Sequence, residues 1–290
     1  MEGSITGKRT VNDTVDLSSG KGHRDENFPV ASFLLSAEHR APIMAFYRFA
    51  RRADDIADHG DATPEEKLAQ LGRMRSGLDG AADGAPEALA LRAVMAERGL
   101  DPVHARDLLV AFERDVTVDR CADWAALIDY CRYSAMPVGR FVLDVHGEDR
   151  NGWVANDALC AALQIVNHLQ DCGKDYRTIR RVYLPLDTLT EHGARVEDLA
   201  AERATPELRS AIVASAGRAR ELLAKSAPFA GLIRDRKLAA EVAVIQRLAE
   251  SLAMRLEQRD PLSERVHHRK AEAAFLAARA ALPLLFRRAA

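Results

Sequence analysis

Apolar residues recur along most of this chain at intervals of three and four, the spacing that places them on one side of an α-helix. The first such stripe is made by Phe46, Phe49, Ala50, Ala53, Ile56 and Ala57. Later stripes are made by Ala105, Leu108, Leu109, Phe112 and Val116, and by Leu238, Val242, Ile245, Ala249, Leu252 and Leu256. Strict alternation of apolar and polar residues, which would indicate strands, is scarce. The pattern therefore predicts an all-α fold.

Helix start signals divide this pattern into separate elements. Thr63-Pro64-Glu65-Glu66 has the form of a capping box with proline at the first helical position, and Thr205-Pro206-Glu207 opens a later helix in a similar way. Asp101-Pro102 starts another, and Pro137 predicts a kink within a helical region. These signals give a chain of medium-length helices joined by short loops.

The domain organisation follows from the absence of any repeat or interdomain linker. Residues 1–22 are polar and glycine-rich and lack the apolar segment of a signal peptide, so they predict a flexible tail. The chain then enters its helical region from Asn27-Phe28-Pro29. We predict one all-helical domain over residues 23–290.

The first helix carries an unusual polar face beside its apolar stripe. Tyr47, Arg51, Asp54 and Asp58 follow one another at steps of four and three, so they share a face. Two carboxylates one turn apart repel each other, and helix stability alone does not favour them. They are explained if a divalent cation lies between them and holds a phosphate that Arg51 also contacts. The alternative is an ordinary solvated helix face.

A second segment repeats this arrangement. Gln164, Asn167, Asp171 and Asp175 lie at steps of three, four and four, while Leu159, Leu163, Val166 and Leu169 face elsewhere. Either run alone could be a solvated face. Two such helices side by side would place carboxylates across a gap, where magnesium completes its coordination with phosphate oxygens and water. The pair of faces therefore predicts a site for a diphosphate leaving group.

Composition excludes several classes of protein. The formal net charge of the 290 residues is −2, which gives no electrostatic case for nucleic-acid binding. The four cysteines show no paired short spacing, which favours reduced thiols in a cytosolic protein. No apolar run is long enough to span a membrane. We expect a cytoplasmic protein, with the inner membrane face as a secondary expectation.

Several other polar residues have ordinary structural interpretations. Glu264 and His267 have a spacing known from di-iron sites, but a single copy favours a surface cluster. His168 is interpreted as a structural histidine rather than a proton carrier. Asp115 and Asp119 are four apart on another helix and are expected to be solvated. The apolar segment 274–288 is expected to pack on the core, with membrane-surface contact as the alternative.

Three blocks of the sequence resemble the squalene/phytoene synthase family. They are the segment 47–58, the segment Tyr130-Cys131-Arg132-Tyr133-Ser134-Ala135-Met136-Pro137-Val138-Gly139, and the run from Gln164 through Arg181-Val182-Tyr183-Leu184-Pro185. Their order and spacing match the family across nearly the whole chain after residue 25. Within the family, Glu26-Asn27-Phe28-Pro29-Val30-Ala31-Ser32 and Phe49-Ala50-Arg51 are similar to the hydroxysqualene synthases of the bacterial hopanoid route.

The resemblance implies a single-domain isoprenoid synthase fold with helices around a central apolar cavity, and it implies roles for particular residues. The metal-binding positions are Asp54, Asp58, Asn167, Asp171 and Asp175. The substrate-binding positions are Tyr47, Arg51, Gln164, Asn167, Arg181 and Tyr183, and the catalytic positions are Tyr130, Arg51 and Tyr183. Tyr130 corresponds to the tyrosine that faces the reacting carbons.

The implied reaction is the ionisation of presqualene diphosphate with capture of water, in squalene and hopanoid biosynthesis. Two or three Mg²⁺ ions are expected with the diphosphate. No nicotinamide cofactor is expected, because no glycine-rich dinucleotide-binding motif is present. Expected partners are presqualene diphosphate and, transiently, pathway enzymes and the membrane surface. The alternatives are head-to-head condensation of two prenyl diphosphates to presqualene diphosphate, squalene or phytoene, and a catalytically silent helical scaffold.

Overall fold

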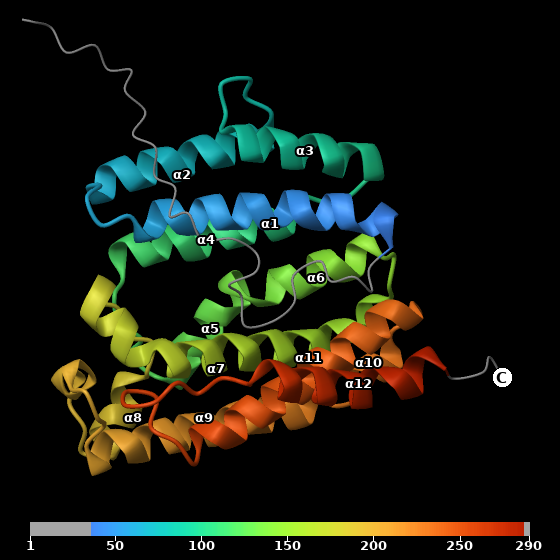
Figure 1. Ribbon diagram of the computed structural model, residues 1–290. Helices are drawn as coiled ribbons and strands as arrows, with labels where there is room; N and C mark the ends of the chain where they lie inside the picture. The colour runs from blue at the N-terminus through green and yellow to red at the C-terminus, as the bar shows by residue number, and fades with distance from the viewer. Residues whose placement is uncertain (1–35, 287–290) are drawn as a thin grey trace, which may run out of the picture.

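The computed structural model of the chain describes residues 36–286, and this part of the chain is built from helices (Figure 1). The α-helices are α1 (Ala37–Asp58), α2 (Pro64–Asp79), α3 (Pro86–Arg98), α4 (Val103–Thr117), α5 (Trp124–Ser134), α6 (Met136–Val145), α7 (Trp153–Ile179), α8 (Leu186–Glu191), α9 (Pro206–Ser226), α10 (Phe229–Leu232), α11 (Arg236–Leu256) and α12 (Lys270–Leu285). Two 3₁₀ helices, η1 (Arg150–Gly152) and η2 (Val196–Ala200), complete the set. Within residues 36–286 the β-structure is limited to an isolated bridge between Arg120 and Val182. The predicted all-α fold is confirmed.

The helices are arranged in two groups joined by a short connecting pair. Helix α1 packs on α3 and α4, and α2 packs on the same two helices. Helix α7 packs on α9 and α11 in the second group. Helices α5 and α6 contact both α4 and α7, and they lie between the two groups in Figure 1. The two helices with acidic faces, α1 and α7, therefore belong to different groups, and α5 and α6 lie between those groups.

Local sequence signals account for the helix ends. Thr63 accepts a hydrogen bond from the backbone nitrogen of Glu66 while the Glu66 carboxylate accepts one from the backbone of Thr63, so the predicted capping box is present. Helix α2 ends at Gly80 with a φ of 105°, a left-handed conformation that glycine adopts without a steric penalty. The predicted kink at Pro137 is wrong. Proline lies in the first turn of α6, where its missing N–H leaves no hydrogen bond unmade, so the chain starts a new helix there.

The apolar stripes read from the sequence form the core. Phe46, Phe49, Ala53, Ile56 and Ala57 of α1 are buried, as are Leu159, Val166 and Leu169 of α7 and Leu238, Val242, Ala249, Leu252 and Leu256 of α11. The four cysteines are free thiols, as predicted. The tail at residues 1–22 and the entry from Asn27-Phe28-Pro29 lie outside the described residues.

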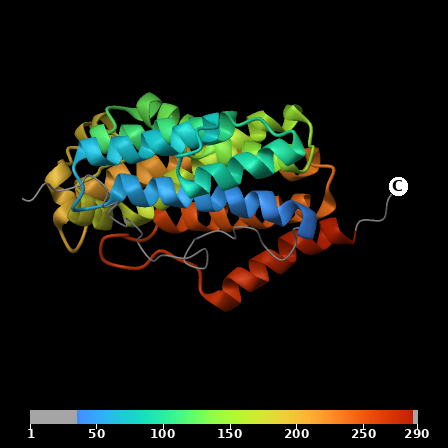
Figure 2. The same ribbon diagram turned by 90° about the horizontal axis from the view of Figure 1, so that it is seen from above.

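The last helix differs from the expected core packing. Helix α12 lies against α11 on the outside of the molecule (Figures 1 and 2). Ala281 is buried in that contact, whereas Phe275 is 63% exposed and Leu282 is 50% exposed. The segment is thus a surface helix with one buried side. Within the described residues, no helix has both the length and the apolar character that crossing a bilayer requires.

Candidate active site

The two polar faces predicted from the sequence are present on α1 and α7. Tyr47, Arg51, Asp54 and Asp58 are half-buried on α1, and Gln164, Asn167, Asp171 and Asp175 are half-buried on α7. In both helices the apolar stripe on the other side is in the core. Each helix is therefore held by its apolar side, and its oxygen-bearing side chains are left at the boundary with solvent.

The charges of these two faces act on each other. Burial raises the pKa of Asp54 to about 7, and the neighbouring charge of Asp58 adds to the shift while Arg51 opposes it. Burial likewise raises the pKa of Asp175 to about 7, with further increases from Asp171 and from Asp58. Because Asp58 acts on carboxylates of both helices, the two acidic faces lie within electrostatic reach of each other.

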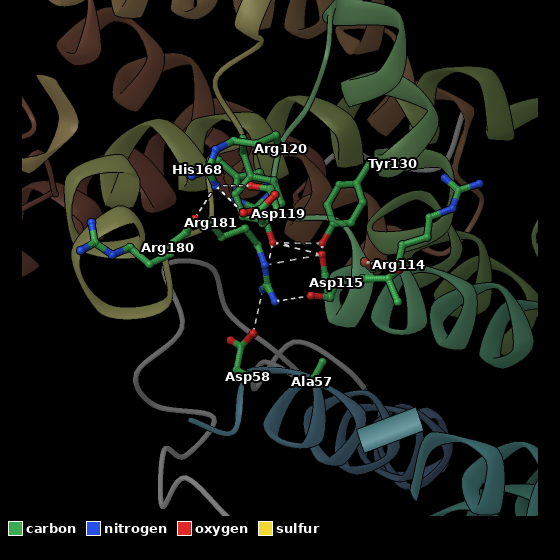
Figure 3. Close-up of polar contacts among 12 residues, drawn as sticks. Ala57, Asp58, Arg114, Asp115, Asp119, Arg120, Tyr130, His168, Arg180 and Arg181 are labelled. Atoms are coloured by element: carbon green, nitrogen blue, oxygen red, sulfur yellow. Dashed lines mark hydrogen bonds and ion pairs between the residues drawn. The ribbon is translucent and has the colours of Figure 1, made fainter. Parts of the chain in front are cut away.

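Arg181 connects the α1 face to the segment that follows α7 (Figure 3). Its guanidinium Nη1 lies 2.7 Å from Oδ1 of Asp58, and its Nη2 donates to the backbone carbonyl oxygen of Asp115 at 2.9 Å. Arg181 is 8% exposed. A planar guanidinium can contact two partners at once, which a lysine ammonium does with less precision. The residue is thus a buried cation between α1 and α4.

Asp115 is a buried neighbour of Arg181, contrary to the expectation from the sequence. Its side chain is 7% exposed, although we expected it to be solvated. Its Oδ2 accepts a hydrogen bond from the Tyr130 hydroxyl at 2.9 Å, and its Oδ1 accepts one from Tyr183 at 3.4 Å. Burial raises the pKa of Asp115 to about 6, and the positive charge of Arg181 limits the shift. Asp119, in contrast, has a side chain that is 69% exposed, as expected.

The helical spacing of the sequence indicates that Asp115 is buried. Asp115 lies three residues after Phe112 and seven after Leu108, so it falls within the apolar stripe of α4. A carboxylate at that position must find partners or lose its charge. The tyrosines and the arginine that serve as partners come from other elements. Spacing alone therefore shows that a carboxylate lies in the apolar stripe, but it does not show which residues stabilise it.

The two tyrosines and His168 form an aromatic group beside this carboxylate. The hydroxyls of Tyr130 and Tyr183 lie 3.3 Å apart, and the His168 ring stacks on Tyr183 with centroids 3.4 Å apart. Nε2 of His168 lies 2.9 Å from Nε2 of Gln164. Burial, and then the charge of Arg181, lower the pKa of His168 to about 3. The ring is therefore neutral, which favours the structural role expected for it.

Arg51 is held by carboxylates of its own helix. Its Nη1 lies 3.0 Å from Oδ2 of Asp54, and its Nη2 lies 2.9 Å from Oδ1 of Asp55. Asp55 was not among the predicted site residues because it falls between the two metal-type positions. Its pairing with Arg51 keeps the guanidinium on the acidic face of α1.

A cavity of about 270 Å³ borders the tyrosine and aspartate group. Its lining includes Asp115, Tyr130, Arg181 and Tyr183 together with residues at the end of α4. A second, polar hollow of about 540 Å³ is lined by Asp171 and Lys174 of α7 and by residues 261–267. Asp171 therefore faces open space on one side, where a ligand group can approach it.

Known proteins match this chain over most of its length. The chain matches the squalene/phytoene synthase family over residues 22–272. It is 55% identical over 285 residues to the hydroxysqualene synthase of Zymomonas mobilis, a match that covers 98% of this chain and 96% of the relative. It is also 55% identical over 252 residues to the hydroxysqualene synthase of Rhodopseudomonas palustris, covering 87% and 86% of the two chains.

Solved structures show the same fold. The squalene synthase HpnC of Alicyclobacillus acidocaldarius superposes with a TM-score of 0.67 at 29% identity, covering 79% of this chain and 87% of the other. A dehydrosqualene synthase superposes with a TM-score of 0.78 at 21% identity, covering 91% and 93%. The helical arrangement is that of an isoprenoid synthase whose family members act on prenyl diphosphates. The chain belongs to the squalene/phytoene synthase family.

Proposed function

We propose that this chain converts presqualene diphosphate and water to hydroxysqualene and diphosphate. The observation that carries the proposal is the position of Asp58, whose charge acts on the acidic faces of both α1 and α7 and whose carboxylate pairs with Arg181. Such a group of carboxylates and a buried arginine suits a departing diphosphate. The choice within the family rests on the 55% identity to the hydroxysqualene synthase of Zymomonas mobilis over nearly the whole chain.

In the proposed reaction the C–O bond to the diphosphate breaks and its electron pair leaves with the diphosphate. The resulting cyclopropylcarbinyl cation rearranges with cleavage of a C–C bond of its three-membered ring, and the rearranged carbocation takes the oxygen of one water molecule, which releases a proton. Charge separation of this kind is prohibitive in an apolar pocket unless fixed charges stabilise it. We assign Arg51 and Arg181 to the leaving diphosphate, with Tyr47, Gln164 and Asn167 as further polar contacts along the same two faces.

The donor set on α1 and α7 fits magnesium. Asp54 and Asp175 have pKa values raised to about 7, first by burial and then by neighbouring carboxylates, and a bound cation would stabilise their charged forms against both effects. We assign Asp54, Asp58, Asn167, Asp171 and Asp175 as the residues that would hold Mg²⁺, an ion that prefers oxygen ligands and keeps places for phosphate oxygens. When bound, magnesium supplies positive charge against the developing diphosphate.

We propose that the two tyrosines act on the carbon side of the reaction. The Tyr130 hydroxyl donates a hydrogen bond to Asp115, which fixes the orientation of the tyrosine. The face of the Tyr130 ring is then the part of the side chain that can interact with a carbocation. Tyr183 is held between Asp115 and the His168 ring. We therefore propose that the rings of Tyr130 and Tyr183 shield and stabilise the carbocation.

Product analysis tests the proposal directly. Purified enzyme would be given presqualene diphosphate with Mg²⁺ in water enriched in oxygen-18, and the products would be identified by mass spectrometry. We expect hydroxysqualene with the label in its hydroxyl group and no dependence on a nicotinamide cofactor. Efficient conversion of farnesyl diphosphate to presqualene diphosphate would instead identify a condensing enzyme of the same family. Absence of any turnover of either substrate would favour the silent scaffold.

A further inference from the structure

Two histidines and an aspartate meet at the end of the molecule away from the aspartate-rich faces. His39 lies in the first turn of α1, His146 follows the last residue of α6, and Asp235 is the N-cap of α11. One ligand atom from each lies within 4.8 Å of the others, and all three residues are half-buried. Among residues 36–286, this is the group of histidine, cysteine and carboxylate side chains with the spacing of a metal site, and no three of the four aspartates of α1 and α7 lie so close together.

Both imidazole rings have an oxygen partner at Nδ1, and Nε2 of His39 also lies 3.7 Å from Oε1 of the exposed Glu38. Nδ1 of His146 lies 2.8 Å from the backbone carbonyl oxygen of Val142, which requires Nδ1 to carry the proton and leaves a lone pair on Nε2. Nδ1 of His39 lies 3.0 Å from the hydroxyl oxygen of Ser36. The two rings are 4.0 Å apart between centroids. Metal-binding histidines are commonly fixed in this way, with the distal nitrogen bonded to a carbonyl or another oxygen.

Asp235 is oriented with comparable precision. Its Oδ1 accepts hydrogen bonds from the backbone nitrogens of Lys237 and Leu238, at 2.8 and 3.0 Å. Its own backbone nitrogen donates to Oε1 of Glu148 at 2.8 Å, and the Glu148 side chain is 3% exposed. These bonds fix Asp235 in place and leave Oδ2 as the oxygen that can bind an ion.

The ligand types select the kind of ion. Imidazole nitrogens suit zinc and other transition metals, whereas magnesium and calcium take oxygen ligands. Bonds of about 2.0–2.1 Å in a tetrahedral zinc site place the ligand atoms about 3.4 Å apart, so closing from the observed spacing requires small side-chain movements. Three protein ligands leave the fourth position for water.

We propose that His39, His146 and Asp235 form a zinc site that is separate from the magnesium-type carboxylates of the active site. The three ligands come from three elements far apart in the sequence, so bound zinc would tie the start of α1 to the end of α6 and the start of α11. Because α1 carries Asp54 and Asp58, the ion fixes one end of the helix that forms half of the active site. Its role is structural.

The test uses the full chain without a polyhistidine tag. Chelator-treated protein would be titrated with Co²⁺, whose visible absorption reports tetrahedral nitrogen and oxygen ligation, and bound Zn²⁺ would be measured by elemental analysis after dialysis. The variants are His146→Gln and Asp235→Asn, and the matched control is His192→Gln, a histidine at the end of α8. Asparagine also caps helices well, so Asp235→Asn keeps the start of α11.

We expect about one equivalent of metal for the unaltered chain and for His192→Gln. Binding should be at least tenfold weaker in His146→Gln and Asp235→Asn, and zinc should raise the Tm of the unaltered chain but not of these two variants. Equal binding by all four proteins, or no binding at micromolar Zn²⁺, would overturn the proposal. Loss of binding in Asp54→Asn rather than in Asp235→Asn would place the ion at the active-site carboxylates and overturn it as well. If His146→Gln does not fold, Asp235→Asn and His39→Gln decide the outcome.

Discussion

Asp115 shows how one buried carboxylate organises several side chains of the site. It accepts hydrogen bonds from Tyr130 and Tyr183, and its backbone carbonyl oxygen accepts one from Arg181. Hydrogen bonds to a charged acceptor are stronger than those between neutral groups. The cost is visible in its pKa, which burial raises to about 6. Asp115 therefore acts as a positioning residue that fixes two aromatic rings and a cation.

Replacing Asp115 by asparagine tests this role. Asp115→Asn keeps the size of the side chain but removes the charge that faces Arg181 and one of the two acceptor oxygens. We expect kcat/KM for presqualene diphosphate to fall by about 10–100-fold, which corresponds to roughly 1.4–2.7 kcal/mol of barrier. The control is Asp119→Asn, which alters an exposed carboxylate just beyond the end of the same helix. Activity of Asp115→Asn equal to that of the control would show that the tyrosines are positioned by packing alone.

At the scale of the helices, most of the fold could be predicted because its signals are local. The stripe on α1, the capping box of α2 and the two faces of α7 each depend on residues within a few turns, and the structure confirms them. Contacts between elements gave no such signal. The pair of Asp58 and Arg181 joins residues 123 positions apart, and only the family resemblance singled out Arg181. Asp115, whose partners lie on other elements, was wrongly predicted to be solvated for the same reason.

The Arg181 contacts make a prediction about how α1 is held against its neighbours. Arg181→Lys keeps one positive charge but has a single ammonium, so it cannot reach Asp58 and the carbonyl of Asp115 together. We expect a lower Tm, by about 2–4 °C for each kcal/mol lost in a chain of this size, and a large loss of turnover. Differential scanning calorimetry and steady-state kinetics measure the two effects.

The control for Arg181→Lys is Arg180→Lys. Arg180 is exposed, and its guanidinium lies over the Tyr176 ring, 5.2 Å from the centroid. Lysine can still contact the face of that ring, so we expect little change in Tm or rate. Equal effects of the two substitutions would mean that Arg181 contributes as a general positive charge and that its contacts with α1 and α4 are unimportant.

For the whole molecule, the raised pKa values of Asp54 and Asp175 mean that their ionised carboxylates lower the free energy of unfolding. Asp54 and Asp175 have folded-state pKa values of about 7, against 3.8 as the ordinary value. Between these two values the folded state binds more protons than the unfolded state, so the free energy of unfolding falls as pH rises from about 4 to about 7. The metal-free protein therefore carries at neutral pH the cost of burying these carboxylates, increased by the repulsion from neighbouring carboxylates, which helix packing must overcome.

Asp175→Asn should consequently stabilise the protein when metal is absent. With chelator at pH 8, we expect its Tm to exceed that of the unaltered chain by about 2–4 °C, the shift that roughly 1 kcal/mol produces. At pH 4 the difference should nearly vanish, because the carboxyl group is then neutral in the folded state. The control is Glu202→Gln, which alters an exposed side chain. A lower Tm for Asp175→Asn at pH 8 would show that the carboxylate is stabilised by partners and contradict the assigned repulsion.

The same repulsion predicts a joint requirement for metal and diphosphate. Chelator should abolish turnover without reducing helical circular dichroism, because α1 and α7 are held in the fold by their apolar sides.

Mg²⁺ with inorganic diphosphate should raise the Tm of the unaltered chain by more than the sum of the two alone, since each ligand supplies charge that the other needs and ligands that bind the folded state stabilise it. Asp175→Asn should begin from a higher Tm and gain little from the pair. An additive response, or an equal gain in both proteins, would mean that the carboxylates of α1 and α7 do not hold metal and diphosphate together. Loss of helical signal on chelation would mark the metal as part of the fold instead.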